Sequence, residues 1–114
     1  MNSNIYDTAN QLERELRTFP AYIQVKEAME EIRSDEATYA LFQEFQTATF
    51  ELQQLSEEPS EDKIKAVQSL YSKVVENSAI KKLMDNEQQL SLLVEDINQI
   101  ITKPIQEIYQ APTE

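Results

Sequence analysis

The 114-residue chain contains no glycine, cysteine, histidine or tryptophan. Glycine is the usual residue in left-handed backbone, so its absence disfavours β-hairpins, phosphate-binding loops and most tight active-site turns. The lack of cysteine excludes disulfides, thiolate metal ligands and cysteine-bound iron–sulfur clusters, and it agrees with a reducing compartment. The lack of histidine and cysteine also removes catalytic triads, His-based acid–base catalysis and helical di-iron motifs. We therefore expect no catalytic residues, no cofactor and no metal site.

Positive charge is scarce as well. Ten Lys and Arg against 21 Asp and Glu give a formal net charge of −11, which repels nucleic-acid phosphates and anionic lipid headgroups. No apolar run approaches the roughly 20 residues that span a bilayer, and the N-terminal residues lack the basic and apolar pattern of an export signal. We expect a cytoplasmic protein that binds neither nucleic acid directly nor a membrane.

The residues that are present favour helices. The length fits a single helical domain over 1–114 that buries about two thirds of its unfolded surface, with a loose C-terminal tail at 111–114. Apolar residues recur at steps of three and four, the period of one helix face. We predict an all-α bundle of about five helices, completed by homodimerisation, with approximate bounds 3–17, 20–33, 35–56, 60–76 and 79–109.

The helix boundaries rest on capping residues and prolines. Pro20 is tolerated in a first helical turn, with Thr18 as a possible cap before it. Asp35 suits the positive end of a helix dipole. Pro59 disfavours helix in the residue before it, and Ser60 can cap the helix that follows.

The last predicted helix, 79–109, carries the strongest pattern in the chain. Its apolar residues fall on the two seam positions of a seven-residue repeat, which predicts a helical partner; they are Ile80, Leu83, Leu90, Val94, Ile97, Ile101 and Ile108. Pro104 removes a backbone donor and should bend or end the helix.

Glu87 places a carboxylate at a seam position of the same repeat. In one interpretation the carboxylate is buried and selects the register or the partner, as polar seam residues do in coiled coils. In the other, the stripe crosses open surface at this point. We favour the second, because burying an unpaired charge costs several kcal/mol.

The helix predicted over 35–56 is apolar on two sides. One seam comprises Leu41, Phe45, Ala48, Leu52 and Leu55. Tyr39 and Phe50, about three turns apart, share a different face of the helix. Phe42 lies between this second face and the seam. The second face either closes a core within one chain or docks another subunit. The candidate interaction residues are Tyr39, Phe42, Phe50, Leu90, Val94, Ile97, Ile101 and Ile108.

Carboxylates could still act as an acid–base pair or bind a hard cation. Glu27, Glu30 and Glu31 lie close together on the second predicted helix, and a second acidic cluster occupies 57–62. Neither group has a spacing specific to metal binding, so solvated faces and dipole complements explain them better. A carboxylate-based metal-dependent enzyme remains an alternative on these clusters alone.

The order of helix starts, helix breaks and apolar stripes along the chain resembles that of the YheA/YmcA/YlbF family of small helical proteins from Gram-positive bacteria. The resemblance is closest to the YheA-type branch of this family. The similarity covers about residues 4–108. It is carried by Asp35-Glu36-Ala37, Leu41, Phe45, Gln46, Pro59-Ser60, Asn77-Ser78, Ile80, Leu83, Glu87, Leu90, Val94, Ile97 and Ile100.

The resemblance implies an all-helical bundle that tends to self-associate, and no established enzymatic activity. Relatives in the YmcA and YlbF branches act in a regulatory complex that influences messenger-RNA processing by an endoribonuclease, and thereby competence, sporulation and biofilm formation. Those relatives are linked to iron–sulfur clusters held by cysteines, which this chain lacks. The leading hypothesis is a non-catalytic protein that forms a homo-oligomer, a dimer, through its apolar stripes and uses them to bind a second protein as well. The alternative is an accessory subunit of an RNA-processing complex.

Overall fold

The computed structural model describes residues 4–110, which form five α-helices. They are α1 (Ile5–Leu16), α2 (Pro20–Ser34), α3 (Glu36–Gln53), α4 (Glu61–Glu76) and α5 (Ser78–Tyr109). The prediction of an all-α fold with five helices is confirmed. The predicted tail at 111–114 lies outside the described residues, as does residue 3 at the predicted start of the first helix.

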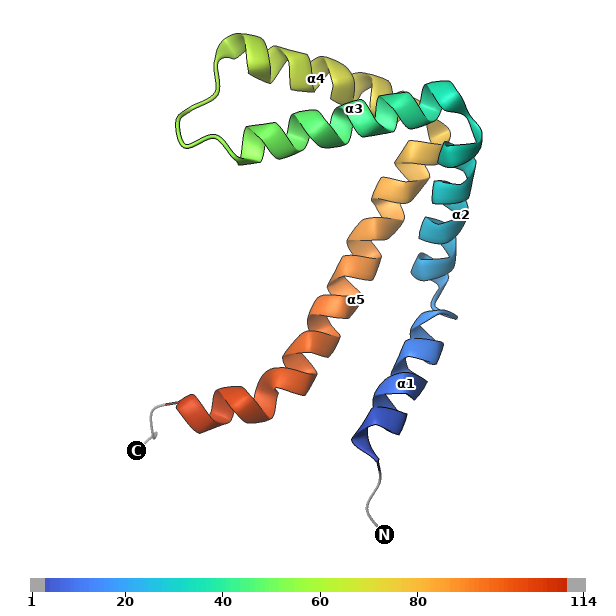
Figure 1. Ribbon diagram of the computed structural model, residues 1–114, viewed down its shortest axis with the longest axis vertical. Helices are drawn as coiled ribbons and strands as arrows, with labels where there is room; N and C mark the ends of the chain where they lie inside the picture. The colour runs from blue at the N-terminus through green and yellow to red at the C-terminus, as the bar shows by residue number, and fades with distance from the viewer. Residues whose placement is uncertain (1–3, 111–114) are drawn as a thin grey trace.

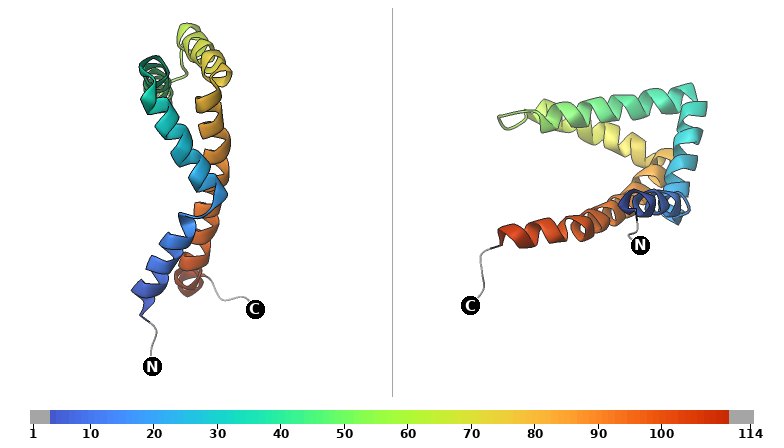
Figure 2. Two further views of the ribbon diagram at one scale, coloured as in Figure 1. Left: turned by 90° about the vertical axis from the view of Figure 1, so that its right-hand side faces the viewer. Right: turned by 60° about the horizontal axis from the view of Figure 1, so that its bottom comes forward.

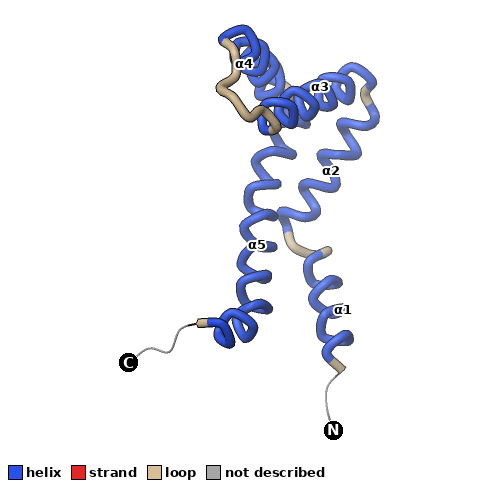
Figure 3. Tube along the Cα trace, turned by 60° about the vertical axis from the view of Figure 1, so that its left-hand side comes forward, coloured by secondary structure: helices blue, strands red, loops and turns tan. Residues whose placement is uncertain are grey.

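The helices form an open, angular arrangement (Figure 1). Helices α2 and α5 lie side by side, while α3 and α4 form an antiparallel hairpin across one end of this pair. Helix α1 continues beyond α2, past a short connection that includes Thr18 and Phe19 (Figure 3). The α3–α4 hairpin and the C-terminal half of α5 enclose an angle that is open on one side (Figure 2, right).

The boundaries follow local chemistry. Asn4, Ser60 and Asn77 cap α1, α4 and α5 by accepting backbone N–H groups. Phe19 precedes α2, with Pro20 in its first turn. The expectation that Thr18 caps this helix is wrong, because its hydroxyl donates backwards to the Glu15 carbonyl at 2.7 Å.

One predicted helix end differs from the structure by more than one residue, and the predicted end of the longest helix is confirmed. Helix α3 ends at Gln53, three residues before its predicted end, so Leu55 lies in the loop that turns the chain back toward α4. Helix α5 continues through Pro104 to Tyr109. Its ribbon bends near that end (Figure 1), as expected where a proline interrupts the hydrogen-bond ladder.

The core lies where α2, α3, α4 and α5 meet. Its largest fully buried side chains are those of Ile32, Val74, Ile80 and Leu83, and each stabilises the fold by about 1.5–3 kcal/mol relative to an exposed side chain. The other buried apolar residues are Ala21, Ala28 and Phe42. Between α3 and α4, the rings of Phe45 and Tyr71 pack at a centroid distance of 6.2 Å.

A chain of hydrogen bonds connects the two helix junctions beside this core. The Asn77 side chain accepts the backbone N–H of Ile80 at 3.0 Å and donates to the Thr38 hydroxyl at 3.2 Å. Thr38, which is buried, donates in turn to the Asp35 carboxylate at 2.7 Å. The α2–α3 junction is thereby fixed against the α4–α5 junction, 39 residues further along the chain.

The chain exposes far more surface than a compact protein of its size. Its radius of gyration is 19.6 Å, whereas a compact chain of this length has about 13 Å. Its accessible surface is 9386 Å², against about 6,400 Å² expected for a compact monomer of this mass. Only about half of the unfolded surface is buried, rather than the expected two thirds.

Candidate protein-interaction surface

Helix α5 is much longer than the helix it packs against. At 1.5 Å per residue its 32 residues extend about 48 Å, whereas the 15 residues of α2 extend about 22 Å. One seam of its repeat turns toward α2: Leu83 is buried, and Leu90 and Ile97 are half-buried. Toward its C-terminal end, the apolar pattern of α5 continues in exposed residues, among them Ile101, Ile105 and Ile108.

The other seam of α5 is exposed along most of its length. We call Glu87, Val94, Ile101 and Ile108 the α5 stripe, because they recur every seven residues and share one face. The exposed fraction rises from 39% at Val94 to 59% at Ile101 and 71% at Ile108. In one chain, the predicted interaction residues of this seam therefore face solvent.

A groove of about 360 Å³ separates the second half of α3 from the start of α5. We call it the α3–α5 groove; it is lined by Phe42, Phe45, Gln46, Thr49, Phe50 and Gln53 of α3 and by Ile80, Met84 and Glu87 of α5. Phe50 is 61% exposed, a large apolar surface at the side of the groove. Aromatic and methionine side chains of this kind are typical of protein-binding sites.

Glu87 is exposed in one chain, as in the interpretation that the stripe crosses open surface. It is the one ionisable group among the residues that line the α3–α5 groove. Partial burial among these neighbours raises the pKa of its carboxyl above the ordinary value, because removing water disfavours the charged form.

The structure divides the predicted residues of α3. Phe42 is only 8% exposed and belongs to the core, so it contributes the floor of the groove and not an open surface. Tyr39 is 36% exposed and does not line the groove. Of the second face predicted for this helix, Phe50 presents most of the accessible apolar surface.

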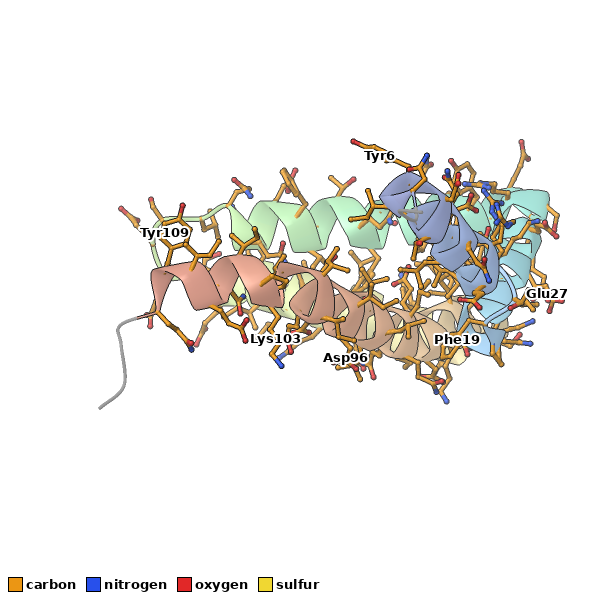
Figure 4. The ribbon with its side chains drawn as sticks, turned by 90° about the horizontal axis from the view of Figure 1, so that it is seen from below. Tyr6, Phe19, Glu27, Asp96, Lys103 and Tyr109 are labelled. Carbon is orange, nitrogen blue, oxygen red and sulfur yellow. The ribbon has the colours of Figure 1, made fainter. Side chains whose placement is uncertain are left out.

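Helix α1 is a second apolar element without a close neighbour. It has no buried residue, and Ile5 and Tyr6 are about three-quarters exposed. Tyr6 projects away from the rest of the chain (Figure 4). The apolar face of α1 is therefore uncovered at its start, at Ile5, whereas Leu12 and Leu16 nearer α2 are half-buried.

Sequence reasoning missed Met84 and the polar residues of the groove. Met84 is half-buried beside the core, one position after the seam residue Leu83, and its place in the groove follows only from the direction in which α3 crosses α5. The hydrogen bond from Asn77 to Thr38 was missed for the same reason, since it joins residues far apart in the sequence.

The acidic cluster on α2 has a structural partner. Lys82 Nζ lies 3.4 Å from Glu27 and 3.5 Å from Glu31, and these ion pairs connect α5 to α2 at the surface. Within residues 4–110, no group of three or more His, Cys, Asp or Glu side chains is arranged to hold a metal ion. Over the same residues, no helix is both long and apolar enough to cross a bilayer.

Comparisons with known proteins identify the family. Residues 5–106 match the family described as control of competence regulator ComK, YlbF/YmcA. A UPF0342 protein of Latilactobacillus sakei is 42% identical over 113 residues, which cover 96% of this chain and 99% of that protein. A UPF0342 protein of Pediococcus pentosaceus is 43% identical over the same shares of the two chains.

Two solved structures are similar over nearly the whole chain. One is a protein of unknown function, DUF964, from Bacillus stearothermophilus, with a TM-score of 0.74 and 28% identity, covering 96% of this chain and 98% of that one. The other is yheA from Bacillus subtilis, with a TM-score of 0.64 and 30% identity, covering 94% and 100%. The predicted resemblance is confirmed, and the chain belongs to the YlbF/YmcA family, among its YheA-like and UPF0342 members.

Proposed function

From membership of this family, we propose that the chain is a non-catalytic cytoplasmic protein that acts by self-association and by binding another protein. The observation that carries this proposal is the uncovered apolar surface of a single chain. A single chain leaves about 3,000 Å² more surface accessible than a compact monomer of this mass would, and the α5 stripe, the α3–α5 groove and α1 all contribute exposed apolar residues.

This area matches what stable assembly requires. Obligate homodimers bury roughly 2,000–5,000 Å² in total, which is about 1,000–2,500 Å² from each partner. The excess surface of one chain covers that share. Contiguous exposed apolar patches larger than a few hundred Å² are unusual on monomeric proteins and mark interaction sites.

The absence of histidine and cysteine and the ion pairing of Glu27 and Glu31 with Lys82 support a non-catalytic role. The net charge of −11 favours protein partners over nucleic acid.

Sedimentation velocity over a range of concentrations tests self-association. We expect a dimer at micromolar concentration, and a strictly monomeric chain over the whole range would refute this part of the proposal. Crosslinking in the native host followed by identification of the captured proteins tests the second part. Recovery of the chain only with itself would restrict the role to self-association.

A second candidate is an accessory regulatory subunit of an RNA-processing complex. The description of the matching family, control of a competence regulator, favours a regulatory role. The net charge of −11 favours a protein over RNA as the target of such a subunit. Transcript ends that are unchanged in a deletion strain would refute this candidate.

A further inference from the structure

The α3–α5 groove and the α5 stripe form one continuous surface. Glu87 belongs to both, since it lines the groove and begins the series that continues through Val94, Ile101 and Ile108. At 1.5 Å per residue, Glu87 and Ile108 lie about 31 Å apart along the helix. The groove lies between α3 and the start of α5, and from there the α3–α4 hairpin and the C-terminal half of α5 diverge (Figure 2, right).

A second copy of the chain fits this surface better than an unrelated protein. The second copy supplies a stripe of the same length and the same aliphatic chemistry. Its own stripe is equally exposed to solvent and would be buried by the same contact. Glu87, at one end, is the single charged residue of the stripe. A partner that is recognised mainly through its charges would therefore find few complementary groups here. A twofold pair would cover both stripes at once, as closed symmetric dimers do.

The position of Glu87 decides between the two possible orientations. A parallel pair in register would bring the two Glu87 carboxylates together at the seam, where like charges destabilise. An antiparallel pair separates them by about the length of the stripe. It also places Val94 opposite Ile101 of the second copy, and Glu87 beside Ile108 at the outer end of the pairing, so that the aliphatic residues of the stripe are covered.

We propose that two copies pair through antiparallel α5 helices, with the last turns of each α5 seated in the α3–α5 groove of the other. This inference rests on the proposed self-association and specifies its geometry. The groove then receives Ile105 and Ile108 of the second copy, which are 57% and 71% exposed in one chain, and these cover Phe50. Pro104 lies between Ile101 and Ile108, close to the end of α5. In the proposed pair, the part of α5 after this proline enters the groove of the second copy.

Engineered disulfides test the orientation, because the natural chain has no cysteine. In an antiparallel pair, Val94→Cys of one copy lies opposite Ile101→Cys of the other. The double variant should therefore form covalent dimers under mild oxidation, while each single variant should not. A disulfide within one chain is excluded, because residues seven apart on a helix are about 10.5 Å apart, beyond the roughly 7 Å that a disulfide can span.

A matched control comes from the opposite side of α5. Asp96 and Lys103 are also seven residues apart, and their side chains project away from α3 (Figure 4). The variant Asp96→Cys/Lys103→Cys should remain uncrosslinked. A second test pair, Glu87→Cys/Ile108→Cys, reports on the groove itself, and circular dichroism of each reduced variant shows that its helices are intact.

The outcomes separate this inference from the proposed function. Crosslinking of the two test pairs, with none in the single variants or the control, supports the antiparallel pair. Efficient crosslinking of Val94→Cys alone would indicate a parallel pair, and a sedimenting dimer without crosslinks in either test pair would indicate another interface; either result overturns the inference and leaves self-association intact. A monomer at all concentrations, or exclusive crosslinking of the stripe to a different protein, overturns both the antiparallel pair and self-association.

Discussion

The substitution Ile101→Ala tests whether the α5 stripe is buried in solution. Ile101 is 59% exposed in one chain, so truncation of a surface residue should change the free energy of unfolding of a monomer by no more than about 0.5 kcal/mol. In the antiparallel dimer the same side chain is buried twice, once in each copy. Truncation of a buried isoleucine costs at least about 2 kcal/mol per site.

The two sites together should weaken the dimer by about 4 kcal/mol or more. Since 1.4 kcal/mol is a factor of ten, the dissociation constant should rise by about three orders of magnitude. Sedimentation velocity over a concentration series measures this change directly. Urea unfolding should also become less dependent on protein concentration, because binding between copies no longer contributes to stability.

The matched control is Ile23→Ala on α2. Ile23 is 39% exposed and lies outside the α5 stripe and the groove, so its truncation should leave the dissociation constant unchanged. If the wild type is a dimer and Ile101→Ala sediments identically over the whole series, the stripe is not the interface. Equal weakening by both variants would mean that the effect acts through the fold.

Three further predictions concern the fold and the groove. Leu83→Ala truncates a fully buried core residue and should lower the free energy of unfolding in urea by about 2.7–5 kcal/mol; a loss below 1 kcal/mol would contradict its place in the core. Asn77→Ala removes the cap of α5 and should lower the free energy of unfolding by about 1 kcal/mol. In a double-mutant cycle with Thr38→Val the two losses should not be additive, because the two side chains share a hydrogen bond; additive losses would disprove this coupling. Because the folded state raises the pKa of Glu87, it holds this proton more tightly than the unfolded state does, and stability should fall as pH rises from the ordinary value of about 4.3 through the raised one. Glu87→Gln should remove this part of the pH dependence and be more stable than the wild type at neutral pH, and an unchanged pH profile would refute the assignment.

Local features of the sequence account for the predictions that succeeded. Pro20 and Ser60 act within one helical turn of the boundaries they set, and the seven-residue recurrence of α5 is visible without knowledge of any other helix. The family resemblance rested on the same local pattern and was confirmed by comparison over nearly the whole chain. The errors also have local causes: Thr18 competes for a carbonyl of the preceding helix, and α3 ends before Leu55 because the chain must turn back toward α4.

The sequence alone determined that the chain forms five amphipathic helices, because helix periodicity and capping depend on residues only a few positions apart. Only the tertiary structure decided which apolar faces are covered. Phe42 and Phe50 are equally apolar in sequence, yet the crossing of α3 over α5 buries the first and leaves the second exposed. The short reach of α2 likewise covers one seam of α5 and leaves the other open, because burial depends on the lengths and angles of packed helices, which no local pattern records.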